Sequence, residues 1–181
     1  NDAGDRIVFT NRAVELRVLE RGAGGWVLAP ERLDAMSPYA HAIYATLRAD
    51  QSTVLFTCGD AEWPADDAGF CEVGIDGTGF RVLGPDTLVG GPGPMADGSI
   101  VFQGEVTESA PELFRLPAAG PPAIPFGPED HENPCVLPDG RVVTRWGLSL
   151  VFLRPDGTEE RELPLELPVA HTPVFLSACG L

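Results

Sequence analysis

The feature that most restricts the fold of this chain is a recurring Asp-Gly turn between short apolar stretches. In residues 131–146, Pro138-Asp139-Gly140 separates the apolar runs Pro134–Leu137 and Arg141–Trp146. Glycine adopts a positive φ at almost no cost, so Asp-Gly between two β-type runs is a strong hairpin signal. The stretch therefore predicts two antiparallel strands joined by a tight turn.

Related turns divide the chain into four similar units. Their first aspartates, Asp5, Asp50, Asp97 and Asp139, follow one another at intervals of 45, 47 and 42 residues. Each unit reads as four short strands, and antiparallel strands repeating at such a period are typical of propeller blades. We predict an all-β, four-bladed β-propeller that forms a single domain over residues 1–181. The predicted repeats are 5–49, 50–96, 97–138, and 139–181 together with 1–4.

The two ends of the chain are expected to complete one blade. The segment Thr172–Cys179 is apolar and has no strand after it, and Arg6–Thr10 has no strand before it. Pairing them would close the ring and remove two open sheet edges. The one stretch that permits a helix is Pro30–Ala45, where Pro38 limits it to a short helical turn at most.

The Pro-Asp-Gly turn before an apolar strand resembles the repeat of the TolB-like propeller family. The resemblance covers all four units loosely and is closest in residues 131–146. The sequence departs from the family pattern at Cys135, where an aromatic residue is usual, and at Gln51, where glycine is usual. The resemblance implies a binding scaffold and transfers no catalytic residue.

The charge of the chain restricts its partners. There are 27 acidic and 12 basic side chains, which give a net charge of -15. Such a protein repels nucleic-acid backbones and anionic membranes. No apolar run approaches the roughly 18 residues of a membrane span. We therefore expect a protein or small-molecule partner, with a basic protein or a cation as the choice that the charge favours, and the chain is also a candidate homodimer.

The four cysteines permit disulfides, and the sequence alone leaves three pairings open. Cys58 ends one predicted strand and Cys71 begins the next in the same blade, 13 residues away. Hairpin geometry brings such residues within bonding range, so we predict a Cys58–Cys71 bridge. Cys135 and Cys179 lie in different blades and are expected to stay unpaired. Disulfides and a polar beginning without a signal peptide lead us to expect a trimmed chain that is secreted or periplasmic.

The histidines form a candidate metal site. His41, His131 and His171 each lie just before the first strand of a repeat. First strands surround the axis of a propeller, so the three imidazoles would converge at one mouth of the channel. Three histidines with an open position suit Zn, Fe or Cu. The alternative is that each histidine caps the entry to its strand through local hydrogen bonds.

Three other residues are candidates for ligand binding. Asp130 and Glu132 flank His131 and would support it or contact a ligand, and Trp63 lies in an acidic loop beside a proline. Trp26 and Trp146 occur within strand patterns and are expected to pack between blades.

These patterns favour one function and leave two alternatives. We predict a non-catalytic propeller that recognises a protein or small ligand at the mouth of its channel. The first alternative is a metal-dependent enzyme that uses the three histidines. The second is a half-ring, two copies of which assemble into a larger propeller.

Overall fold

The computed structural model describes residues 5–11, 15–35, 37–48, 50–60, 69–84, 91–104 and 112–165 of the chain. The described residues form strands and turns without a helix. None of them lies in a helix long and apolar enough to cross a membrane. The strands are β1 (Arg6–Thr10), β2 (Leu16–Gly22), β3 (Gly25–Leu28), β4 (His41–Leu47), β5 (Thr53–Gly59), β6 (Gly69–Gly74), β7 (Arg81–Gly84), β8 (Gly93–Pro94), β9 (Ile100–Gly104), β10 (Glu112–Leu116), β11 (Ile124–Pro125), β12 (Glu132–Val136), β13 (Val142–Trp146), β14 (Ser149–Leu153) and β15 (Glu159–Pro164).

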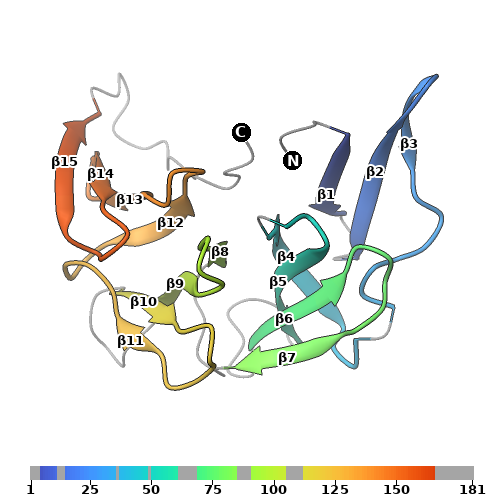
Figure 1. The fold of residues 1–181 in the computed structure, drawn as a ribbon, viewed down its shortest axis with the longest axis horizontal. Helices are drawn as coiled ribbons and strands as arrows, with labels where there is room; N and C mark the ends of the chain where they lie inside the picture. The colour runs from blue at the N-terminus through green and yellow to red at the C-terminus, as the bar shows by residue number, and fades with distance from the viewer. Residues whose placement is uncertain are drawn as a thin grey trace.

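The strands form four antiparallel sheets, each made of strands that follow one another in the sequence. One sheet has three strands in the order β1-β2-β3, and the other three have four strands each. Figure 1 shows the sheets arranged around a common centre, with β4, β8 and β12 near it and β3, β7, β11 and β15 at the rim. The all-β prediction and the division into four repeating sheets are therefore confirmed.

The first strand of each four-stranded sheet lies innermost. Contacts join β1 to β4, β4 to β8 and β8 to β12 in a continuous series. Asp5 precedes β1 as Asp139 precedes β13, so β1 corresponds to the second strand of a sheet and not to the first. The expected first strand, Thr172–Cys179, lies outside the described residues. Closure of the ring by that strand therefore stays a prediction.

The recurring turns are stabilised by an aspartate in each. Its carboxylate accepts a hydrogen bond of 3.0 to 3.1 Å from the backbone N–H two residues later. Four of these carboxylates also accept a hydroxyl hydrogen bond, and the fifth binds an arginine side chain. The aspartates are Asp50, Asp76, Asp97, Asp139 and Asp156. All five turns lie at the same end of the sheets, because they join first to second strands or third to fourth strands.

The core lies between neighbouring sheets. On β5, Val54 and Phe56 pack toward the first sheet, whereas Leu55 packs toward β9 of the third. On β9, Ile100 and Phe102 face the second sheet and Val101 faces the fourth. Because side chains alternate between faces along a strand, near-continuous apolar runs in these two strands bury both faces of their sheets.

The segment with helical potential has another structure. Residues 30–35 and 37–40 form turns and bends, one turn being closed by the Ser37 N–H donating to the Asp34 carbonyl, and β4 starts at His41. Pro38 opposes a helix through this segment, because proline has no N–H to donate and keeps the preceding residue out of the helical region. Ala42 is instead buried against the core as part of a strand.

Candidate functional site

One end of the inner strands gathers the residues that the sequence singles out. We call it the mouth: the end at which β4 and β12 begin and β5 and β13 end. His41 is the first residue of β4 and is opposite Gly59 of β5. His131 directly precedes β12, whose first residue Glu132 is opposite Arg145 of β13. Antiparallel pairing thus places both histidines at the same end of the sheets.

His131 is a buried residue held in one orientation. Only 3% of it is exposed, and its Nδ1 lies 2.8 Å from the Glu129 carbonyl oxygen. A carbonyl oxygen only accepts, so Nδ1 is the donor in this contact and Nε2 is the ring nitrogen left for another partner. Nε2 is buried and has no hydrogen-bond partner among the described residues. The sequence did not reveal this arrangement, because burial of His131 depends on the neighbouring strands.

Trp146 lies against His131 at the end of β13. The two rings are parallel within 6°, with centroids 6.3 Å apart. Nevertheless 47% of Trp146 is exposed. The prediction that Trp26 and Trp146 pack between blades is therefore wrong: Trp26 is also half-exposed, on the rim strand β3. Strand position was a poor guide here because Trp26 lies on an edge strand and Trp146 at a strand end, where the described sheets leave them half-exposed.

The backbone around His131 adopts unusual conformations. Asp130 and Asn133 have φ of 64° and 54°, a left-handed region that residues other than glycine enter at a cost. Asn133 falls in a register shift of the β12–β13 pair, and Tyr44 occupies the equivalent shift in β4 with φ of 53°. Bulges of this kind redirect side chains, and they are frequent beside binding sites.

Gln103 of β9 supports the bulge in β12. Its Oε1 accepts a 2.8 Å hydrogen bond from the Asn133 N–H, and Gln103 is itself buried. A polar residue in the apolar stretch of β9 was the sequence signal for this role, and it was not recognised. The contact joins the third and fourth sheets at the mouth.

The repeats do not place His41 and His131 at equivalent positions. His41 precedes its turn aspartate Asp50 by nine residues, whereas His131 precedes Asp139 by eight. A shift of one residue moves a side chain to the other face of a strand. Accordingly Ala42, and not His41, is the buried equivalent of His131.

The three-histidine metal site stays a prediction. His171 lies outside the described residues, as does Trp63. Across the described ranges no three His, Cys, Asp or Glu side chains are grouped so that they would hold a metal ion. Of the other candidates, Glu132 forms an ion pair with Arg145, and Asp130 is exposed at the left-handed position before His131.

Acidic groups outnumber basic ones at the mouth. The ion pairs of Glu132 with Arg145, of Glu15 with Arg32 and of Asp34 with Arg32 leave the other carboxylates there without a compensating arginine among the described residues. The described acidic residues of this end are Glu15, Glu31, Asp34, Asp60, Glu112, Glu129, Asp130 and Glu132, and its arginines are Arg17, Arg32 and Arg145. The described part of the mouth therefore carries an excess of negative charge.

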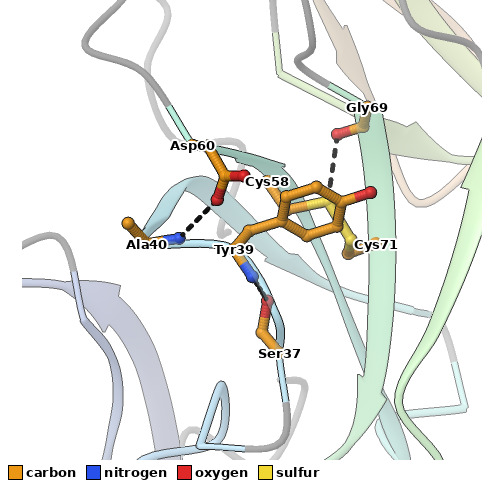
Figure 2. The surroundings of a disulfide bond; sticks show 7 residues. All are labelled: Ser37, Tyr39, Ala40, Cys58, Asp60, Gly69 and Cys71. Atoms are coloured by element: carbon orange, nitrogen blue, oxygen red, sulfur yellow. Dashed lines mark hydrogen bonds between the residues drawn. A yellow bond between two sulfur atoms is a disulfide. The ribbon is translucent and has the colours of Figure 1, made fainter.

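A disulfide fixes the second sheet at the mouth. Cys58 of β5 and Cys71 of β6 are bonded, with a Cα–Cα distance of 5.9 Å, as predicted. Figure 2 shows the bridge beside Tyr39, together with the hydrogen bond from the Ala40 N–H to Asp60. The bridge therefore joins the strands on either side of residues 60–68.

The second cysteine prediction is wrong. Cys135 of β12 is disulfide-bonded, although its position in a separate blade suggested a free thiol. Cys179 lies outside the described residues. Placement in a separate blade was a poor guide, because β12 also contacts β8 and β9 of the neighbouring sheet, so a blade does not isolate its residues.

Comparisons with known proteins identify the fold. No family model and no curated protein matches the chain. Solved structures do: TolB from Acinetobacter baumannii superposes with a TM-score of 0.61 at 18% identity, over 91% of this chain and 41% of that one. A Mycobacterium tuberculosis puromycin-hydrolyzing peptidase superposes with a TM-score of 0.59 at 18% identity, over 93% and 28%.

A third similar structure is a calcium-binding protein, regucalcin, from Agrobacterium tumefaciens. Its TM-score is 0.55 at 15% identity, over 86% of this chain and 58% of that one. The chain thus spans less than two thirds of each of these proteins. At such identities the likeness shows a propeller fold, and fold does not determine function.

Proposed function

We propose that this chain is a non-catalytic binding domain that recognises a positively charged ligand at the mouth. The ligand is a basic segment of a protein or a small organic cation. The observation that carries the proposal is Trp146, a half-exposed tryptophan whose ring is braced by buried His131 within a mainly acidic surface.

The physical basis is the attraction between a cation and an aromatic face. An ammonium or guanidinium group over tryptophan gains about 0.5 to 2 kcal/mol, more where water is excluded. His131 limits the motion of Trp146, so less conformational entropy is lost on binding. Surrounding carboxylates raise the local concentration of cations and accelerate their association.

A pair of peptides tests this proposal. A short arginine-rich peptide should bind the full chain in titration calorimetry, should weaken with added salt, and should bind better than a glutamate-rich peptide of equal length. Trp146→Ala should weaken binding about fivefold, the equivalent of about 1 kcal/mol. Trp26→Ala is the matched control, because Trp26 is similarly exposed but lies on the rim. Equal binding of both peptides, or equal effects of both substitutions, would contradict the proposal.

A metal-dependent function is the second candidate, because the Nε2 of His131 has no hydrogen-bond partner within the described part of the chain. A lone pair on a neutral imidazole is a good ligand for Zn, Fe or Cu, and His41 and His171 would complete the set. Metal content measured by mass spectrometry should then fall in His41→Ala, His131→Ala and His171→Ala alike. If the purified wild-type chain takes up none of these metals, this candidate is wrong.

The burial pattern of the last sheet, β12-β13-β14-β15, supports assembly of half-rings as a third candidate. Along β14 the side chains alternate between buried and half-buried, so Leu150 and Phe152 lie on a face that is only partly covered. Two copies that complete a larger ring would bury this face. Leu150→Glu should then prevent dimerisation in sedimentation analysis, and an unchanged sedimentation profile would contradict this candidate.

The Cys58–Cys71 bridge supports a secreted or periplasmic location. Disulfides persist in oxidising compartments and are rare in a reducing cytosol. Mass spectrometry of the chain isolated from its source compartment without reductant would test whether Cys58 and Cys71 are bonded there.

A further inference from the structure

The rim strand β3 differs from the rim strands of the other three sheets. Its residues Trp26, Val27 and Leu28 are 44%, 61% and 47% exposed. They follow one another directly, so both faces of the strand present large apolar side chains to solvent. Such a strand at the edge of a sheet readily pairs with another strand.

The other rim strands carry features that discourage pairing. Strand β15 exposes Glu159, Glu160, Arg161 and Glu162. Strand β11 has two residues and ends in proline, and β7 begins with an exposed arginine. Charges, prolines and short strands protect edges from association. Strand β3 has none of the charges or prolines.

The backbone of β3 is oriented for pairing. The Ala29 N–H donates a 2.9 Å hydrogen bond to the Val18 carbonyl of β2. Hydrogen-bonded and non-hydrogen-bonded pairs alternate along antiparallel strands. Val27 therefore bonds with β2, whereas the N–H and C=O groups of Trp26 and Leu28 point away from β2, toward an edge that no described strand pairs with.

Charge selects the partner for this edge. Residues 1–29 contain four acidic and four basic side chains, so the entire net charge of -15 belongs to the rest of the chain. Two negatively charged copies repel each other at most of their surfaces, but residues 1–29, which have no net charge, do not add to this repulsion. Beside the strand, exposed Glu20 is already neutralised by an ion pair with Arg6.

We propose that two copies of this chain pair through β3, antiparallel and about a two-fold axis. A symmetric pairing requires a self-complementary strand. With the axis at Val27, Trp26 of each copy lies opposite Leu28 of the other and exchanges backbone hydrogen bonds with it, while the two Val27 side chains meet. The sheets β1-β2-β3 of the two copies become one continuous sheet. This interface is separate from the mouth and from the face of β14.

A charged substitution at the axis tests the pairing. Val27→Lys would place two lysines opposite each other and should raise the dissociation constant of the dimer at least about tenfold in sedimentation equilibrium. Val82→Lys is the matched control, because Val82 is 47% exposed on rim strand β7. It should leave the dimer intact, as should Leu150→Glu, which tests the half-ring interface instead. The proposal would be overturned if the wild-type chain stayed monomeric at every protein concentration tested. Equal dissociation constants for the two lysine variants would overturn it too.

A cross-link supplies a second readout that does not depend on affinity. In the proposed register the two Val27 residues form a close, non-hydrogen-bonded pair, which suits a disulfide. Oxidation of Val27→Cys should yield a covalent dimer on a non-reducing gel. Oxidation of Val82→Cys should not, and a similar yield from both variants would refute the pairing.

Discussion

At the mouth, a contact between two single residues joins neighbouring sheets. Asn133 adopts a left-handed conformation in β12, and its N–H is satisfied by Gln103 of β9. An unpaired buried N–H costs about 1–3 kcal/mol. Gln103 therefore stabilises a strained bulge that shapes the mouth beside His131.

Replacing Gln103 tests this support. Gln103→Met keeps the length of the side chain but removes the acceptor, so the free energy of unfolding should fall by about 1–3 kcal/mol in urea titrations. Leu113→Met is the control, since Leu113 is opposite Gln103 in the β9–β10 pair and such a volume-conserving change usually costs less than about 1.5 kcal/mol. If both variants are equally stable, the hydrogen bond has no structural role.

At the scale of elements, the aspartate turns couple stability to pH. Hydrogen bonds lower the pKa of Asp50 and Asp97 below the ordinary value, chiefly those from the Ser52 and Ser99 hydroxyls. The pKa of Asp139 is lowered in the same way, chiefly by the Arg141 side chain. A carboxyl whose folded pKa is depressed adds stability above its unfolded pKa and loses it as the pH falls through its folded pKa.

We therefore expect an acid-sensitive fold. The urea midpoint should be nearly level above about pH 5 and fall steadily below about pH 4. Asp97→Asn should lower the midpoint at neutral pH and flatten the decrease in acid, because the substituted residue no longer titrates. If the urea midpoint of Asp97→Asn falls as steeply with decreasing pH as that of the wild type, this turn does not contribute to the acid sensitivity.

The disulfide in the second sheet is another stabilising element. It closes a loop of 13 residues, and a loop of about this size is worth roughly 3 kcal/mol in the chain-entropy account. The double variant Cys58→Ser/Cys71→Ser should lose about that amount in chemical denaturation. A reductant would also break the disulfide of Cys135, so the wild type and the double variant are compared without reductant. An unchanged midpoint would mean that the β5–β6 pair is already fixed without the bridge.

At the scale of the whole molecule, burial differs along the series of sheets. Strands β5 and β9 of the middle sheets are buried along nearly their whole length, whereas β2 and β14 alternate between buried and less buried residues. A sheet that packs on one face alternates in this way. The first and last sheets thus have one partly covered face each within the described chain.

Deletion of residues 172–181 tests closure of the ring. If this segment pairs with β1, its loss exposes an edge, and the truncated chain should melt earlier and aggregate on heating. Full-length Cys179→Ser is the control, because the deletion also removes this thiol. A truncated chain that stays monomeric and melts like the control would disprove closure by this segment.

Residue type and spacing along the chain correctly predicted much of the local structure. These features are the turns at Asp50, Asp97 and Asp139, the strands Arg6–Thr10, Glu112–Leu116 and Ser149–Leu153 with these bounds, and the Cys58–Cys71 bridge. These features follow from interactions between residues that are near in sequence, such as an aspartate and the N–H two positions later. Residue type and spacing therefore suffice to predict them.

Which side chains are covered and which distant residues meet depended on the packing of the sheets and could not be predicted from the sequence. This packing buried His131 and left Trp26 and Trp146 half-exposed, set His41 and His131 one position out of register, and placed Gln103 against Asn133. It also brought Cys135 into a disulfide. The physical reason is that burial and contact between blades depend on how whole sheets pack, and a shift of one residue along a strand reverses the face that a side chain occupies.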